Sequence, residues 1–142
     1  MASPLTMYGA ALFLRAVLTP DVYTAPTGLE VALTRTVPPR NASADQLVEP
    51  TQTEYERQAY FLDGLHWAPT NFGELYNTTK ITFPQVGTTG WGLIAGWALV
   101  DPGSGQCLTV GSIMNPYQAV AGMIPFLDPG TLVLGLYDNG GN

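Results

Sequence analysis

The chain has 142 residues, which is room for one hydrophobic core and hardly for two. Its net charge of −6 argues against nucleic acid as a partner, because phosphate backbones repel an acidic chain. Hydrophobic residues make up 46% of the chain and charged residues only 11%, well below the roughly 25% of ordinary globular domains, so the surplus apolar surface predicts burial against other protein chains.

The first predicted element is a short helix over residues 5–18, which Pro20 ends. Its apolar positions recur at helical spacing: Leu5, Tyr8, Leu12 and Ala16. Arg15 interrupts the apolar run, and no stretch reaches the roughly 18 apolar residues that a membrane span needs. The run also lacks a basic n-region before it, so we expect neither a membrane span nor a secretory signal.

The middle of the chain predicts two strands separated by a loop. Residues 29–34 alternate, with apolar odd-numbered positions on one face and Glu30 and Thr34 on the other, which indicates a half-buried strand. Residues 37–52 contain three prolines and no periodicity, so we expect an exposed loop there. Residues 54–62 alternate again and predict the second strand.

The second half of the chain predicts three further strand regions. After an irregular stretch over residues 66–77, a short strand is expected at 80–83. Two apolar runs within residues 91–113 are joined by a glycine-rich connector, which is typical of a β-hairpin. The last predicted strand is 130–137, and residues 138–142 are expected to form a flexible tail.

These elements predict an all-β fold. About six or seven short strands separated by turn residues are typical of a β-sandwich or a jelly-roll-like barrel, here with a short N-terminal helix. No repeat or linker divides the chain, so we expect a single β domain over residues 1–142. It would consist of an N-terminal helical arm (1–23), a β-sandwich (24–137) and the tail.

The chemistry-bearing residues are sparse. His66 and Cys107 are each the single residue of their kind, and the acidic residues are scattered, so no metal site, cofactor or catalytic triad is predicted. Cys107 lies in a strand-like run, where a free cysteine packs as a small hydrophobe. His66 follows Leu65 and precedes Trp67, and we interpret it as a packing residue with a satisfied ring nitrogen.

One acidic pair and one glycine-rich stretch need a separate interpretation. Glu54 and Glu56 are the nearest carboxylate pair, but a glycoside hydrolase would need two acids about 5 to 9 Å apart in a groove. We favour a solvated strand edge with Arg57 and Lys80 as counter-charges. Residues 87–92 are rich in glycine but lack a P-loop lysine, which indicates a turn.

Five aromatic residues leave two interpretations open. Flat rings stack on sugar faces, but aromatic side chains more commonly pack in a core or a subunit contact. We therefore favour packing and keep carbohydrate binding as a minor hypothesis. The residues are Trp67, Phe72, Tyr76, Trp91 and Trp97.

Several short segments follow one another in a recognisable order from Thr24 onward. They are Leu29-Glu30-Val31-Ala32-Leu33-Thr34, Glu49-Pro50 with Tyr55-Glu56-Arg57-Gln58, Asn77 with Ile81-Thr82-Phe83-Pro84, Gly90-Trp91-Gly92, Ala98-Leu99-Val100-Asp101 with Gly105, Ala121-Gly122, and Leu132. This order resembles a family of small tailed-phage virion proteins, whose members tend to read as a Y-L-A-L strand, a G-Y-x-R-Q strand, an I-x-F-P strand, W-G and a closing hairpin. In one departure, Glu54 stands where the family has the glycine before the tyrosine.

The resemblance implies a β-sandwich-like fold in a phage particle, with head-decoration, minor-tail or tail-fibre roles, and it implies no catalytic residue. Together with the apolar surplus, it leads us to predict a non-enzymatic virion protein, assembled in the host cytoplasm as a homotrimer. The leading hypothesis is a capsid decoration (cement) protein on the major capsid protein. The alternative is a minor tail, tail-tip or tail-fibre subunit that contacts other tail proteins and the host surface. The predicted contact residues are Leu12, Phe13, Pro38, Pro39, Tyr117, Pro125 and Phe126.

Overall fold

The computed structural model describes residues 3–19, 24–26, 28–70 and 73–135. In chain order its elements are β1 (Ser3–Pro4), α1 (Met7–Leu18), β2 (Leu29–Thr34), the 3-10 helix η2 (Ala44–Gln46), β3 (Gln58–Tyr60), β4 (Trp67–Pro69), β5 (Leu75–Asn77), β6 (Ile81–Thr82), β7 (Gly92–Asp101), β8 (Gln106–Ala119), β9 (Phe126–Leu127) and β10 (Val133–Gly135).

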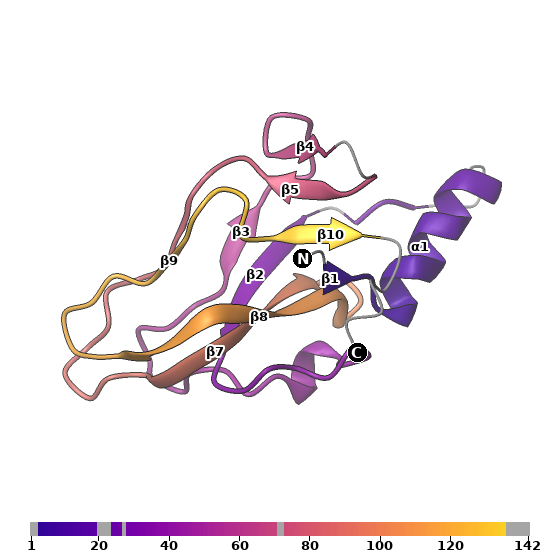
Figure 1. Cartoon of the computed structure of the whole chain (residues 1–142). Coiled ribbons are helices and arrows are strands. Elements are labelled where there is room, and N and C mark those ends of the chain that lie inside the picture. Colours follow the sequence, from indigo (N-terminus) through magenta and orange to yellow (C-terminus); the bar gives the residue numbers. More distant parts are fainter. Residues whose placement is uncertain (1–2, 20–23, 27, 71–72, 136–142) are drawn as a thin grey trace.

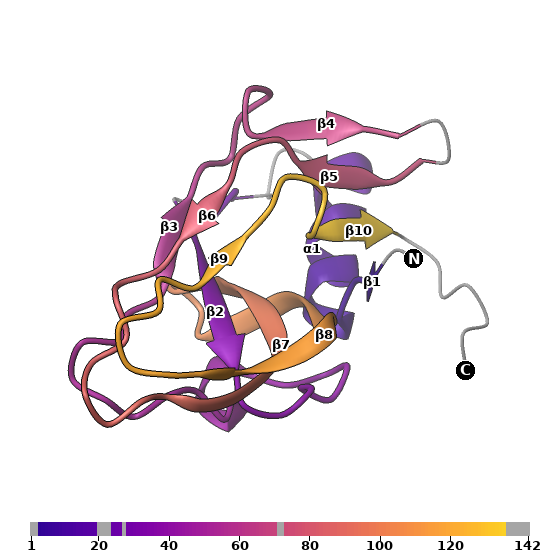
Figure 2. The ribbon, with the colours of Figure 1, turned by 60° about the vertical axis from the view of Figure 1, so that its left-hand side comes forward.

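The strands of the described residues form three sheets. Their orders are β1-β10-β5-β4, β3-β2-β7-β8 and β6-β9. All neighbours pair antiparallel except β1 and β10, which run parallel. The two four-stranded sheets form layers, α1 lies at one end of the molecule, and the β6-β9 pair bridges the layers on the opposite side (Figures 1 and 2).

The predicted fold class is confirmed, with one alternative removed. The chain is mostly β with one N-terminal α-helix, and α1 covers most of the predicted helix. The strands of the described residues lie in three separate sheets and do not close into a barrel. The strand count is higher than predicted because β1, β4, β5 and β9 were not expected. β1 and β9 are only two residues long, which is too short to leave a periodicity in the sequence.

β7 and β8 form the predicted β-hairpin. Its register contains a large bulge: Ile94 pairs with Tyr117 and Gly96 with Ser112, so residues 113–116 of β8 face Ala95 alone. The bulge reverses the alternation of β7. As a result Ile94 and Trp97, which would point to opposite faces of a regular strand, both enter the main core.

Trp97 also explains a glycine in the facing strand. Gly111 pairs with Trp97, and a Cβ atom at Gly111 would lie 2.5 Å from the indole ring. The ring therefore occupies the space that a side chain would take. The main core around it gathers buried side chains from both layers, including Leu29, Val31, Leu33, Tyr60, Ile81, Phe83, Val86, Trp91, Leu99, Leu127 and Leu132.

Two predictions about β2 and the segment after it are wrong. β2 is buried on both faces, because Ala32 and Thr34 are also inaccessible to solvent. The segment 37–52 covers the second face of the sheet around β2. It contains η2, and its residues Ala44 and Leu47 pack against a second buried cluster on that face. A proline-rich stretch without periodicity thus forms part of the core. The second cluster consists of Ala32, Ala98, Val100, Cys107 and Val110.

The strand predicted over residues 54–62 is shorter, and the irregular stretch 66–77 is more ordered, than the sequence indicates. Only β3 is a strand in the first region, so Glu54 and Glu56 lie in the turn before it. The second region contains β4 and β5. These strands escape prediction because β4 ends in a proline and β5 ends in Asn77, residues that are rare in strands.

Candidate functional site

The first turn of α1 attaches the helix to β8. The backbone N–H of Thr6 donates to the carbonyl of Leu108 at 2.8 Å, and its hydroxyl donates to the carbonyl of Cys107. The same hydroxyl accepts the N–H of Gly9 at 3.0 Å as the N-cap of the helix. A Cβ atom at Gly9 would collide with the Leu108 carbonyl, so glycine permits this close approach.

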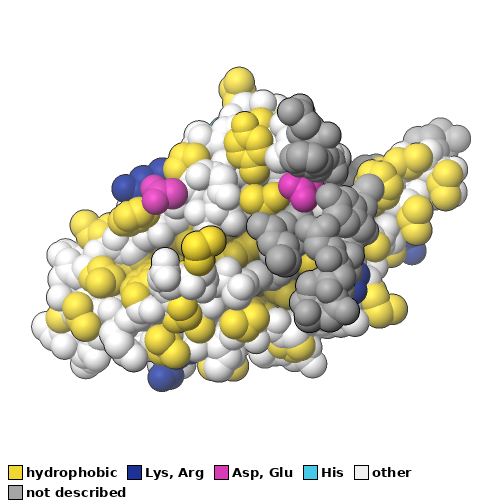
Figure 3. Space-filling model, viewed as in Figure 1, with side chains coloured by type: hydrophobic (Ala, Val, Ile, Leu, Met, Phe, Trp, Pro, Cys, Tyr) yellow, Lys and Arg dark blue, Asp and Glu magenta, His cyan; other side chains and the backbone are white. Residues whose placement is uncertain are grey.

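Beyond this turn the helix presents two faces. The inner face carries Tyr8, Leu12 and Ala16, as the sequence predicts, and these side chains are partly buried. Tyr8 donates to a carboxylate oxygen of Asp101 at 2.8 Å. The opposite face, here called the outer face of α1, is also apolar and is exposed (Figure 3); it consists of Met7, Phe13, Leu14, Val17 and Leu18.

A groove of about 900 Å³ opens between β8 and the segment around β9. We call it the β8-β9 groove, and Figure 3 shows apolar side chains gathered in the hollow between β8 and β10. Met114, in the bulge of β8, is 92% exposed at this groove. The lining residues on the β8 side are Ser112, Ile113, Met114, Asn115 and Tyr117, and those on the other side are 123–131 and Val133.

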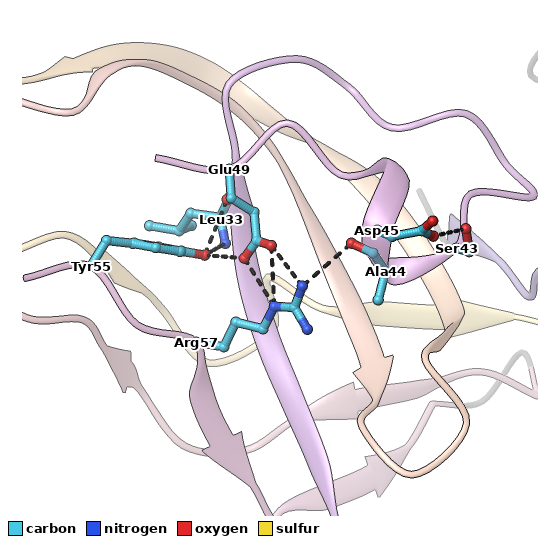
Figure 4. A network of polar contacts seen from close by, with 7 residues as sticks. All are labelled: Leu33, Ser43, Ala44, Asp45, Glu49, Tyr55 and Arg57. Atoms are coloured by element: carbon cyan, nitrogen blue, oxygen red, sulfur yellow. Dashed lines mark hydrogen bonds and ion pairs between the residues drawn. The ribbon is translucent and has the colours of Figure 1, made fainter. Parts of the chain in front are cut away.

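A network of polar contacts holds the segment 37–52 against β2 (Figure 4). The guanidinium of Arg57 binds the Glu49 carboxylate through two nitrogens, at 3.0 Å from Nε to Oε1 and 2.7 Å from Nη2 to Oε2. The Tyr55 hydroxyl donates to Glu49 at 2.7 Å and accepts the N–H of Leu33 at 3.1 Å. Burial and the neighbouring Glu49 charge raise the pKa of Tyr55 well above its usual value.

The network corrects one predicted pairing. Arg57 binds Glu49 and not the predicted acids Glu54 or Glu56, and its pKa is raised by its hydrogen bonds to the Glu49 carboxylate. Lys80, the other predicted counter-charge, lies 3.8 Å from the ring centroid of Phe126 in a cation-π contact.

Glu54 makes hydrogen bonds to two residues that lie more than 30 positions away in the sequence, and its own position did not indicate them. Its Oε1 accepts the N–H of Gly87 at 2.8 Å and the indole N–H of Trp91 at 2.9 Å. Its own backbone N–H, then Trp91 and Gly87, hold its pKa below the usual value. The acid that replaces the family's glycine therefore ties the 87–91 turn to the turn before β3.

The remaining titratable candidates have packing roles. Cys107 is buried, and this burial raises its pKa to about 11, so the thiol is a core group as predicted. The Nδ1 atom of His66 lies 2.6 Å from Asp63, and the imidazole packs on the ring of Phe61. Within the described residues, no three His, Cys, Asp or Glu side chains are grouped to hold a metal ion.

The aromatic residues do not form the sugar platform considered from the sequence. Trp91 and Trp97 are buried in the core, and Trp67 and Tyr76 are half-buried. Phe72 lies outside the described residues. A different ring, Phe61, is 60% exposed and lines a shallow pocket of about 270 Å³ together with His66 and Lys80. No signal in the sequence distinguished this ring from the others.

The predicted contact residues fall in three places. Leu12 and Phe13 lie on α1, with Leu12 half-buried and Phe13 exposed. Tyr117, Pro125 and Phe126 come together as lining residues of the β8-β9 groove, although the side chain of Pro125 is buried.

The two prolines of the segment 37–52 differ. Pro39 is exposed, whereas Pro38 is buried against the strands and so is not available to a partner. The assignment of these residues to a contact stays a prediction. Among the described residues, no helix combines the length and the apolar character that crossing a bilayer requires.

Comparison with known proteins identifies the family. The family model described as podophage GP4 fiber I protein gp80 matches residues 4–135, and the chain therefore belongs to this family of phage fibre proteins. No curated protein matches the chain in sequence.

Membership corrects the leading functional prediction. The capsid decoration assignment is wrong, and the tail-fibre alternative is the one that the family supports. The broader prediction, that the chain is a structural protein of a phage particle, is confirmed. The error has a physical origin, since cement and fibre subunits share what the sequence reveals: a β module with too much apolar surface for a free monomer.

Proposed function

We propose that this member of the fibre family is a non-enzymatic structural subunit that assembles as a homotrimer with other fibre and tail proteins. The observation that carries the proposal is the outer face of α1. A helix with apolar side chains on two opposite faces is normally buried on both, yet Leu14 and Leu18 are 53% and 71% exposed here. Their burial requires a neighbouring subunit.

The charge distribution supports the same function. A fibre subunit needs contacts that tolerate changes of ionic strength outside the cell, and apolar contacts are far less sensitive to salt than ion pairs are. The outer face of α1 and the β8-β9 groove together carry many exposed apolar side chains and few charges. The family's name for its member places that protein in a fibre, and the same place is proposed for this chain.

The location is tested by labelling purified virions with an antibody against the chain and measuring its copy number relative to the major capsid protein. Label at the tail and far fewer copies than capsid subunits are expected. Label spread over the head at a copy number near that of the capsid protein would overturn the proposal.

A second candidate function, contact with the host surface, is favoured by the loop that follows β3. Phe61 and Leu65 are exposed there beside the paired Asp63 and His66. An exposed ring next to hydrogen-bonding groups is suited to stack on a sugar. Titration of host envelope saccharides, followed by NMR, should shift the signals of this loop in the wild-type chain and not in a Phe61→Ala variant. The absence of shifts in the wild type would remove this candidate.

A further inference from the structure

The outer face of α1 is left uncovered by the described part of the chain. Among the described residues, the first turn of the helix is bonded to β8 and the outer-face side chains are exposed. The second half of the helix projects beyond the body of the molecule (Figures 1 and 3). Phe13 and Val17, and likewise Leu14 and Leu18, are four residues apart and form adjacent rows on one side. Rows at this spacing are the anchors with which an amphipathic helix enters an apolar groove.

The β8-β9 groove offers a complementary surface. Met114 and Ile124 stand on its two sides with 92% and 51% of their surface exposed, and Phe126 lies beside Ile124. The hydroxyl of Tyr117 is buried at the groove without a hydrogen-bond partner among the described residues. On this side of β8, residues 110–119 pair with no strand of the described chain other than β7.

The two surfaces lie on different sides of the molecule. The groove is lined by β8 and the segment around β9. In Figure 1 β9 lies at one end of the molecule, while α1 stands at the other end, beyond β10. Because the first turn of α1 is fixed on β8 by Thr6 and Gly9, the helix of a given copy stays away from its own groove. A contact between the two surfaces therefore joins different copies head to tail.

The charges of the two surfaces are opposite. Arg15 is the single charged residue of α1 and adjoins the outer face next to Leu14. Asp128 is the single charged residue among the lining residues of the groove in the described chain. Neither side chain has an ion pair within the described residues. Lys80 lies over the ring of Phe126, one of the lining residues of the groove.

We propose that the outer face of α1 of one copy docks into the β8-β9 groove of the next copy, with Arg15 beside Asp128 of the neighbour. The inference rests on the fibre-subunit function proposed above and specifies the surfaces through which two copies of the subunit bind each other. A head-to-tail contact of this kind closes into a ring when its rotation permits, and three copies would make the proposed homotrimer.

Two single variants test the contact because they act on opposite surfaces. Leu14→Asp places a charge on the outer face of α1, and Met114→Asp places one in the groove; both positions are exposed, so the fold should survive. Sedimentation velocity should show an oligomer for the wild-type chain and monomers for each variant. An equimolar mixture of the two variants should form a dimer, because one intact outer face meets one intact groove.

The mixture distinguishes the proposed contact from others. A symmetric contact between two helices would leave Met114→Asp oligomeric by itself, because its outer face is intact, and that result would overturn the inference. A mixture that stays monomeric, a monomeric wild type or an oligomer that persists in both variants would overturn it as well. Leu65→Asp is the matched control, since Leu65 is 80% exposed on a different loop. It should leave the oligomer intact.

Charge reversal tests the proposed register. Arg15→Glu and Asp128→Arg should each weaken the association by about fivefold, the upper range for an exposed ion pair. The double variant should recover the wild-type affinity. Two effects that simply add would contradict the pairing of these residues.

Failure of this contact is separable from failure of the fibre function. If Leu14→Asp virions keep the chain at the tail while the purified variant is monomeric, the fibre function and the self-contact both stand as independent properties. If Leu14→Asp abolishes binding to phospholipid vesicles, or to another virion protein, without changing the oligomer, the outer face has that other occupant and the inference is wrong.

Discussion

The segment 37–52 and the helix α1 both lie against the sheet β3-β2-β7-β8, but they are attached in different ways. Glu49 is bound by Arg57 and Tyr55, Pro38 and Ala42 are buried, and Ala44 and Leu47 are partly buried against the sheet. The helix is held at its first turn and by its inner face, and its outer face stays in solvent.

The difference teaches how a charge-poor chain divides its apolar residues. The segment 37–52, which has no periodicity, is held by the partly buried ion pair between Glu49 and Arg57 and packs on the chain's own core. The periodic element, with the stronger signal in the sequence, is the one left partly uncovered. Stability and assembly should therefore respond to different substitutions, and the following predictions separate them.

The largest effect is expected for Trp97→Ala, in the main core, which contains neither of the two regions. Removing a buried indole should lower the free energy of unfolding by about 3 to 5 kcal/mol, because Gly111 and its neighbours leave the cavity open. Urea denaturation measures the change. Leu65→Ala, at an exposed site, should stay within about 0.5 kcal/mol of the wild type. An equally small loss for Trp97→Ala would show that the main core is not where the stability lies.

Arg57→Met should release the segment 37–52 selectively. The substitution leaves the Glu49 carboxylate without its cation, at a cost of about 1 to 3 kcal/mol for a pair that keeps some contact with solvent. Amide hydrogen exchange should accelerate at Ala42 and Ala44 and not in α1. Arg57→Lys, which keeps the charge but loses the two-pronged contact, should give an intermediate result. Unchanged exchange at Ala44 would argue that packing alone holds the segment.

Thr6→Ala should act on the other region. Loss of the N-cap and of the hydrogen bond to Cys107 should cost about 1 kcal/mol and accelerate exchange in α1, with β2 and β7 unaffected. Thr6→Ser retains the hydroxyl and should behave like the wild type. If Thr6→Ala also loosened the segment 37–52, the two regions would be coupled and the comparison would fail.

The smallest effect concerns Glu54 and appears only in acid. Its folded-state pKa lies below the ordinary value of 4.5, so its contribution to stability is present above that value and is lost as the pH falls through the folded pKa. Glu54→Gln should remove this part of the pH dependence. Urea midpoints measured from about pH 6 to about pH 3 test it, and the exposed Glu56→Gln is the matched control. Identical slopes for all three proteins would contradict the role of Glu54.

Much of the fold could be predicted because it depends on local patterns. The helix, β2, the β7-β8 hairpin and the burial of Cys107 all follow from periodicity and turn residues within a short window. The candidate site could be predicted only in part. Tyr117, Pro125 and Phe126 were expected at a contact, but nothing in the sequence brings them into one groove, since the bulge at Ala95 decides the position of β8.

By itself, the sequence determined that this is a β-rich protein with more apolar surface than one chain buries, because composition and alternation are local and additive properties; the order of its short motifs added the resemblance to phage virion proteins. Only the tertiary structure decided which apolar surface stays uncovered and what the isolated acids do. The burial of the segment 37–52, the pairing of Glu49 with Arg57 and the task of Glu54 all depend on which distant strands meet. Such contacts across the fold leave no periodicity along the chain.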